Sequence, residues 1–272
     1  MKLGIFDTVF PRPTFAETIA AIKDAGFSFI QLDYATLGLD SMPTSIPDDL
    51  AQASWCETNS RRVHVAAVGG TYNMIHPDPE IRAQGLLALE AIARSCKEID
   101  TAIITLSTGT RDAENMWRRH PDNDTPEAWD DLLAAIDAAL AIADRHEVTL
   151  AFEPEPANVA KNAIVARKLL DHFAHPRLKI CFDAANIVAS DLTRDPAVVL
   201  DEAFALLGAD IVTAHGKDIS AEGRFCPAGT GIVPWQHCLQ KFTEVGYQGP
   251  LVLHSLTEED VPTAIRATTP SA

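Results

Sequence analysis

The chain has 272 residues, 47% of them hydrophobic and 22% charged, and its formal net charge is −16. The negative charge argues against a nucleic-acid binder or a ligand of anionic membranes, because such proteins normally present a basic face. No window approaches the roughly 20 consecutive apolar residues of a spanning helix. Five scattered cysteines fit neither a disulfide framework nor a zinc cluster, so we expect reduced thiols and a cytoplasmic location.

Short apolar runs alternate along the chain with segments of helical spacing. The clearest helix is predicted at 79–99, where apolar residues advance by three and four. Thr125, Pro126 and Glu127 together are typical of a helix start. The long connection before them, 107–124, contains Trp117 among mixed charges, which predicts an ordered lid. The predicted strands are 3–6, 27–32, 63–68, 102–106, 149–156, 178–182, 211–214 and 250–253, and the predicted helices are 15–25, 47–62, 79–99, 125–145, 160–173, 196–207, 235–245 and 258–267.

Eight strands, each followed by a helix, predict the α/β class. Strict alternation implies parallel strands with helical crossovers, and eight such units close a (β/α)8 TIM barrel. The rival is an open doubly wound sheet, which would carry a glycine-rich phosphate loop after its first strand. Residues 7–10 are not such a loop. Because no linker interrupts the chain, we predict one domain spanning 1–272.

The stretch 149–156 is an apolar run that ends in two carboxylates interleaved with two prolines. Each proline favours extended geometry in the residue before it, so Glu153 and Glu155 are expected to be extended. Residues two apart on an extended chain share one face, about 6 to 7 Å apart. Both carboxylates can therefore face one pocket, where an ionised carboxylate needs a cation, a donor or a metal.

If the barrel is right, residues just past the strand ends meet at one mouth. Four of them, from four successive strand ends, supply two oxygens and two imidazole nitrogens: Glu153, Asp183, His215 and His254. This mixed set without thiolate suits one divalent ion among Mn²⁺, Mg²⁺, Co²⁺, Fe²⁺ and Zn²⁺. Structural roles are the alternatives: a turn cap for Asp183, packed histidines for His215 and His254, and a rim ion pair between Glu155 and Lys217.

Further polar residues are candidates for binding a substrate. Near the predicted mouth these are Asn73, Arg111, Asn186 and Arg224, while His64 belongs to the third predicted strand, where a buried hydrogen-bonded role is the alternative. The two arginines, with the main-chain amides near Gly229 and Gly231, are candidates for binding a phosphate or carboxylate. The sequence leaves the charge of the substrate open.

Four segments together resemble the xylose-isomerase-like TIM barrels known as sugar phosphate isomerases and epimerases. They are Leu150-Ala151-Phe152-Glu153-Pro154, Phe182-Asp183-Ala184-Ala185-Asn186, Thr213-Ala214-His215-Gly216-Lys217-Asp218 and Pro227-Ala228-Gly229-Thr230-Gly231. The resemblance implies that Glu153, Asp183 and His215 bind a divalent metal. Epimerases of this family usually place a second metal-binding glutamate after strand eight, where this chain has His254. Likewise, Asn186 stands where ketose epimerases have a substrate-binding histidine.

The resemblance implies a metal-dependent sugar, sugar phosphate or polyol isomerase or epimerase. A metal-chelated carbonyl would acidify the adjacent C–H, and an enediolate would form when a base removes that proton. Glu153 is the first candidate for the base, and Glu155 or Lys217 for the group that returns the proton. The expected partner is a small carbohydrate, and a homo-oligomer is left open.

Three alternatives stay open at this point. A dehydratase of a keto-polyol would use the same metal and base but lose a β-hydroxyl. A non-catalytic sugar-binding barrel is favoured by the missing glutamate at His254. A phosphodiesterase of the apurinic-endonuclease type would need several metals and a basic groove, which the charge of −16 opposes.

Overall fold

The apolar runs form parallel strands that pair side by side into a closed barrel in a computed structural model that describes residues 1–270. The order around the barrel is β1-β10-β7-β6-β5-β4-β3-β2, so the last strand closes on the first. This confirms the predicted (β/α)8 TIM barrel, while residues 271 and 272 of the predicted domain lie outside the described part. The barrel strands are β1 (Lys2–Phe6), β2 (Phe29–Leu32), β3 (His64–Gly69), β4 (Ile103–Ser107), β5 (Thr149–Glu153), β6 (Leu178–Asp183), β7 (Ile211–Gly216) and β10 (Pro250–Leu253).

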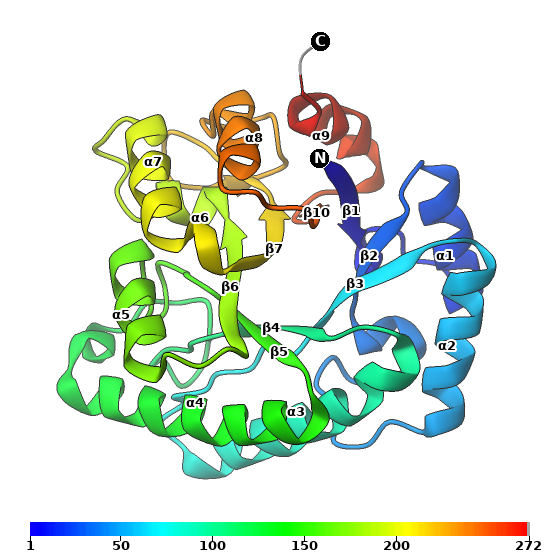
Figure 1. Ribbon diagram of the computed structural model, residues 1–272, viewed down its shortest axis with the longest axis horizontal. Helices are drawn as coiled ribbons and strands as arrows, with labels where there is room; N and C mark the ends of the chain where they lie inside the picture. Colours follow the sequence, from blue (N-terminus) through cyan, green and yellow to red (C-terminus); the bar gives the residue numbers. More distant parts are fainter. Residues whose placement is uncertain (271–272) are drawn as a thin grey trace.

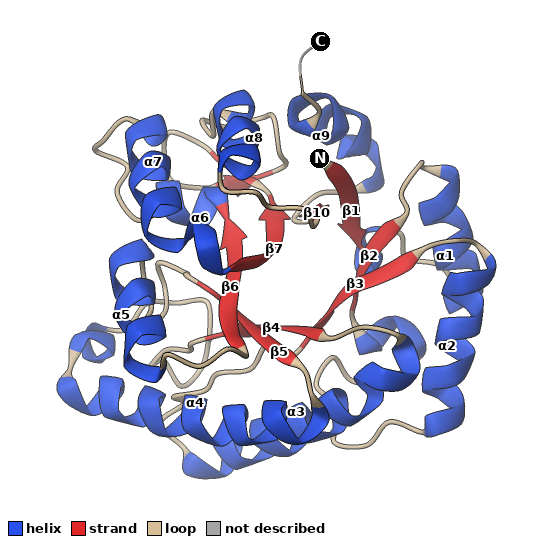
Figure 2. Ribbon diagram, in the orientation of Figure 1, coloured by secondary structure: helices blue, strands red, loops and turns tan. Residues whose placement is uncertain are grey.

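The helices form an outer ring around the strands (Figures 1 and 2). They are α1 (Phe15–Asp24), α2 (Asp48–Ser60), α3 (Pro79–Ile99), α4 (Pro126–His146), α5 (Ala163–Phe173), α6 (Ala184–Ala189), α7 (Pro196–Leu207), α8 (Trp235–Glu244) and α9 (Val261–Thr268). No helix of the described residues combines the length and apolar character that crossing a membrane requires. Two features were not predicted. Helix α6 follows β6 directly, and β8 (Asp218–Ile219) pairs with β9 (Phe225–Cys226) in a small antiparallel hairpin after β7.

Side-chain caps fix where the predicted helices begin. The Thr125 hydroxyl accepts a hydrogen bond from the Ala128 amide at the start of α4, with Pro126 in the first turn. Thr14 and Glu17 form a reciprocal capping box at α1. Asp183 caps α6 by accepting from the amides of Ala185 and Asn186, so the predicted turn-capping role of this aspartate is present in the structure.

The strands carry apolar side chains on both faces, as a parallel sheet covered by helices requires. Phe152 and Phe182, for example, are fully buried. Strand register then brings polar residues level with one another at the carboxyl ends, because Asp183 pairs with His215 across β6 and β7. The register shifts by one residue beside Gln31 in β2 and beside Cys181 in β6. Such irregularities re-aim side chains near functional sites.

The long connection after β4 is ordered by its own polar side chains. Asp112 accepts hydrogen bonds from the amides of Glu114 and Asn115 and pairs with the Arg118 guanidinium. Asn123 accepts from the Arg111 amide and donates to the Ala157 carbonyl, 2.9 Å away. These contacts hold the segment against the loop after β5, and they confirm the predicted ordered segment.

Candidate functional site

A cavity of about 540 Å³ opens at the carboxyl ends of the barrel strands. Its walls come from strand ends and from the loops that follow them, which is where barrel enzymes keep their sites. The residues that line it are Phe6, Gln31, Asp33, Ser41, Gly69, Thr71, Thr105, Trp117, Glu153, Glu155, His215, Lys217, Phe225, His254 and Ser255.

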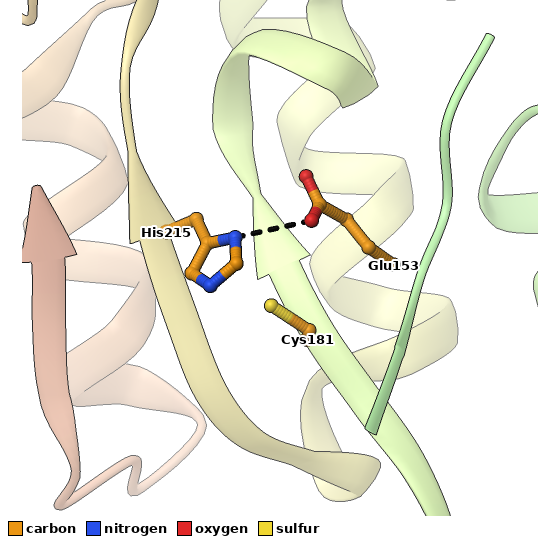
Figure 3. A group of neighbouring side chains, drawn as sticks. All are labelled: Glu153, Cys181 and His215. Carbon is orange, nitrogen blue, oxygen red and sulfur yellow. Dashed lines mark hydrogen bonds and ion pairs between the residues drawn. The ribbon is translucent and has the colours of Figure 1, made fainter. Parts of the chain in front are cut away.

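Glu153 and His215 face each other from β5 and β7 across the end of β6 (Figure 3). Nδ1 of His215 lies 3.0 Å from Glu153 Oε2, and its Nε2 lies 2.8 Å from the side-chain oxygen of Gln31. The side-chain amide of Gln31 donates in turn to the hydroxyl of Thr105, 3.0 Å away. Both imidazole nitrogens are thus oriented by partners from other strands, which fixes the ring in the floor of the cavity.

Asp183 lies fully buried at the end of β6 and has two cationic or imidazole neighbours. Its Oδ2 is 3.0 Å from Lys217 Nζ and 3.1 Å from His254 Nε2, while its Oδ1 receives the two amides that start α6. His254 follows the last barrel strand and stacks on the Phe6 ring, with 4.9 Å between centroids. One oxygen of Asp183 therefore caps helix α6, and the other contacts Lys217 and His254, which line the cavity.

Asn186 and Lys217 connect the two glutamates. The side-chain amide of Asn186 donates to Glu153 Oε1 at 2.5 Å and to Glu155 Oε2 at 2.8 Å. Lys217 Nζ lies 3.7 Å from Glu153 Oε1 and is covered by the Phe225 ring, 4.5 Å from its centroid. The two carboxylates consequently do face one pocket, as the extended geometry of this stretch predicted.

Burial and neighbouring charges shift the pKa values of these groups in different directions. Burial would raise the pKa of Glu153 and Asp183, but the Lys217 ammonium and the neighbouring histidines hold both pKa values below their usual range. Burial raises the pKa of Glu155 to about 7, against the opposing effect of Lys217. Burial also lowers the pKa of His254, which keeps its imidazole neutral at pH 7.

The chemistry of this donor set fits a divalent cation. Ligand atoms of Asp183, His215 and His254 lie within 4.8 Å of one another, and Glu153 touches His215. Three buried or half-buried carboxyl groups, those of Glu153, Glu155 and Asp183, face the single ammonium of Lys217. A divalent cation would offset the excess negative charge, and carboxylate with neutral imidazole is a ligand set that such ions accept.

Two residues that the sequence did not mark lie in the same place. Gln31 orients His215, and its signal was a polar residue within the otherwise apolar strand Phe29–Leu32. Cys181, one of the five cysteines expected to be reduced thiols, is buried, and its sulfur lies within 4.8 Å of ligand atoms of Glu153 and His215 (Figure 3). Burial raises the pKa of the Cys181 thiol, so it forms an uncharged wall beneath the glutamate.

Four of the substrate-binding candidates lie elsewhere. His64 begins β3 at the amino-terminal end of the barrel and is exposed, so it is neither mid-strand nor in the cavity. Asn73 is buried and ties two loops together by bonding both the amide and the carbonyl of Thr110. Arg111 binds the carbonyls of Ile75 and Glu127, and Arg224 is exposed, 3.6 Å from Glu222. Of the five candidates, only Asn186 joins the cluster of Glu153, Asp183 and His215.

Comparison with known proteins gives a consistent picture. The sequence model of the family described as "Xylose isomerase-like TIM barrel" matches residues 19–269. L-ribulose-5-phosphate 3-epimerase UlaE of Shigella flexneri serotype 5b (strain 8401) is 23% identical over 265 residues, which cover 95% of this chain and 88% of that protein. Among solved structures, 3-keto-D-glucoside 4-epimerase YcjR from E. coli superposes with a TM-score of 0.74 at 19% identity, covering 98% and 97% of the two chains. The IOLI protein with a bound zinc atom superposes with a TM-score of 0.71 at 14% identity, covering 98% and 96%.

Proposed function

The chain belongs to the xylose isomerase-like TIM barrel family, and from this premise we propose that it is a divalent-metal-dependent isomerase or epimerase of a small carbohydrate. The observation that carries the proposal is that Glu153, Asp183, His215 and His254 meet from four successive strand ends, with Glu153, His215 and His254 lining one cavity and Asp183 bonded to His254 beneath it. The sugar epimerases among its relatives support the reaction type, and the zinc atom in a similar structure supports the metal.

The two carboxylates and two imidazoles would hold the cation. When bound, such an ion polarises a substrate carbonyl and so makes the neighbouring C–H more acidic. Gln31 contributes by fixing the ring of His215, since it lies 2.8 Å from Nε2. Partners of this kind orient a ligating histidine and affect metal affinity.

The glutamates would carry the proton. Glu153 stays ionised because Lys217 and His215 lower its pKa, so it can accept a proton from the carbon beside the carbonyl and leave an enediolate. Glu155, whose pKa is raised to about 7, is protonated for part of the time at neutral pH and can return a proton. Asn186 keeps the two carboxyl groups side by side by donating to both.

A site with two metal-binding glutamates has a carboxylate on each side of the substrate to remove and to return the proton. In this chain His254 stands in place of the second glutamate. Both imidazole nitrogens of His254 already have partners, since Nε2 lies 3.1 Å from Asp183 Oδ2 and Nδ1 lies 3.1 Å from the Ser255 hydroxyl. Asp33, Glu155 and Lys217 are the remaining proton-carrying groups among the described residues of the cavity wall, and of these Glu155 is joined to Glu153 through Asn186. We therefore place the return of the proton on Glu155 first.

The test begins with metal content and then follows solvent deuterium. The protein purified from metal-supplemented buffer should hold one divalent ion per chain. In D₂O it should catalyse the incorporation of deuterium into ketoses, at the carbon beside the carbonyl. Glu153→Gln should abolish incorporation, whereas Glu98→Gln on the exposed face of α3 should leave it unchanged. Loss of water in place of exchange would indicate a dehydratase. Sugar binding without any turnover would indicate a binding protein.

A further inference from the structure

The walls of the cavity carry an excess of negative charge. Asp33, Glu153 and Glu155 line it, against the single ammonium of Lys217 among the described residues that form its wall. That ammonium is already engaged, 3.0 Å from Asp183 and 3.7 Å from Glu153. Apart from the proposed divalent cation, a phosphate group entering this cavity would find no unengaged cationic side chain to pair with among the described residues of the wall.

The two arginines predicted as candidates for binding an anion, Arg111 and Arg224, do not point into the cavity. Arg111 donates to the carbonyls of Ile75 and Glu127, both at 3.1 Å, and its guanidinium lies 2.8 Å from Asp131 of helix α4. Arg224 points into solvent beside Glu222. Neither side chain lines the cavity.

Two main-chain amides of the glycine-containing loop after β9 are also occupied by a carboxylate. The fully buried carboxylate of Asp218 accepts hydrogen bonds from the amides of Gly229 and Val233, both at 2.9 Å, and from the indole of Trp235 at 3.1 Å. A side chain at Gly231 would collide with this carboxylate, because a Cβ there would lie 2.3 Å from Asp218 Oδ1. The amides of Gly229 and Val233 are therefore bonded to a carboxylate of the protein itself.

Two exposed aromatic side chains, Trp117 and Phe225, are part of the cavity wall. Trp117 is 59% exposed and Phe225 is 44% exposed, although both are large apolar residues, and they reach the cavity from the connection after β4 and from the hairpin after β7. Exposed aromatic rings at a pocket suit an amphipathic ligand whose one face is made of C–H groups. The hydroxyls of Ser41, Thr71 and Ser255, which also line the cavity, suit the hydroxyl groups of such a ligand.

We propose that the substrate is an uncharged carbohydrate, a ketose or keto-polyol without phosphate or carboxylate, held between Trp117 and Phe225. This rests on the proposed function in taking the cavity as the substrate site. It separates this chain from the relative named for a sugar phosphate, L-ribulose-5-phosphate 3-epimerase. The net charge of −16 acts in the same direction, since it repels anions before they arrive.

Titration calorimetry on the metal-loaded protein tests the proposal with matched pairs of sugars. The probes are L-ribulose with L-ribulose 5-phosphate and D-fructose with D-fructose 6-phosphate. We expect the neutral sugar of each pair to bind at least about tenfold more tightly than its phosphate, which corresponds to a difference in binding free energy of about 1.4 kcal/mol. Tighter binding of either phosphate would overturn the proposal, as would failure of both neutral sugars to bind at millimolar concentration.

Variants of the rim add a second measurement. Trp117→Ala should weaken binding of the neutral sugar about twofold to tenfold, the range expected for one aromatic contact, while Leu87→Ala on the exposed face of α3 serves as control. An unchanged affinity in Trp117→Ala would also count against the proposal. Deuterium incorporation into the same sugars separates the two ideas. Neutral sugars that bind without exchange would end the proposed function alone, and phosphates that bind best and exchange would end this inference alone.

Discussion

Lys217 Nζ lies 3.0 Å from Asp183 Oδ2, and both side chains are buried beneath the cavity. Two more carboxyl groups act on the Lys217 ammonium. Glu153 Oε1 lies 3.7 Å from it, and the charge of Glu155 also raises the pKa of Lys217. Burial would lower the pKa of Lys217, but these carboxylates raise it. A single ammonium therefore stabilises three carboxyl groups at the mouth of the barrel.

Replacing this lysine should expose how much the site depends on positive charge. Lys217→Met is expected to lower the free energy of unfolding of the metal-free protein by about 3 to 5 kcal/mol, because Asp183 is left buried without its partner. Added Mn²⁺ or Zn²⁺ should recover more stability in this variant than in the wild type. Urea unfolding with and without chelator measures both effects. Lys241→Met, at an exposed ion pair with Glu244, is the control, and equal losses in the two variants would contradict the prediction.

His254→Glu should change the preference for metals. The variant restores an oxygen ligand beside Asp183, where the wild type offers a neutral imidazole nitrogen. Oxygen ligands favour Mg²⁺ and Mn²⁺, whereas imidazole suits Zn²⁺ and Co²⁺. Competition between Mn²⁺ and Zn²⁺ in binding measurements should therefore shift towards Mn²⁺. His64→Glu makes the same change of charge at the opposite end of the barrel, and a similar shift there would show that net charge alone is responsible.

Much of this site could be predicted because strand ends converge in a barrel. Glu153, Asp183 and His215 each follow an apolar run, and the register of β6 and β7 sets two of them side by side. The helix start at Thr125 was equally local, since a cap depends on residues three apart. Helix α6 was missed because six residues are too few to show a periodicity.

What could not be predicted is the direction in which a loop side chain points. Arg111 was a candidate for the substrate because it follows β4, but Asp131 and two carbonyls hold its guanidinium away from the cavity. The amides near Gly229 were candidates for phosphate, and only the fold shows that Asp218 takes them. Trp117 reaches the rim through the hydrogen bonds of Asp112 within its own loop, and no spacing in the sequence encodes that path.

Asp7 should make the protein less stable as the pH rises. It is fully buried after β1, where it accepts from the Asp33 amide at 3.1 Å and from the Thr36 hydroxyl at 2.7 Å. Burial raises its pKa from 3.8 to about 8, so between these values the folded protein retains a proton that the unfolded chain loses. Its contribution to stability is therefore present below about pH 4 and is lost progressively up to about pH 8.

Asp7→Asn tests this by removing the titration while keeping an oxygen acceptor. The advantage of the wild type over the variant in the free energy of unfolding should shrink by at least about 1 kcal/mol between pH 5 and pH 9, since one pKa unit corresponds to about 1.4 kcal/mol. Urea unfolding at both pH values gives the difference. Asp191→Asn is the control, because the pKa of this partly exposed aspartate is lowered and its titration lies below that window. A constant difference for Asp7→Asn would refute the assignment.

Glu155→Gln should remove a limb of the pH profile of proton exchange. In the proposed mechanism Glu153 is ionised when it takes the proton and Glu155 is protonated when it returns one, so activity should fall as the pH rises through the pKa of Glu155. Burial places that pKa at about 7, and a cation held by the neighbouring carboxylate would move it downwards. The limb is therefore expected at or below pH 7.

The glutamine retains the shape of the side chain and its contact with Asn186, but it cannot release a proton. We expect the rate of deuterium incorporation to fall about a hundredfold or more, as for loss of a general acid, with a profile that no longer declines near pH 7. Glu147→Gln, outside the cavity, should reproduce the wild-type profile. If Glu155→Gln retained the limb, the titrating group would have to be another one, and the return of the proton could no longer be assigned to Glu155.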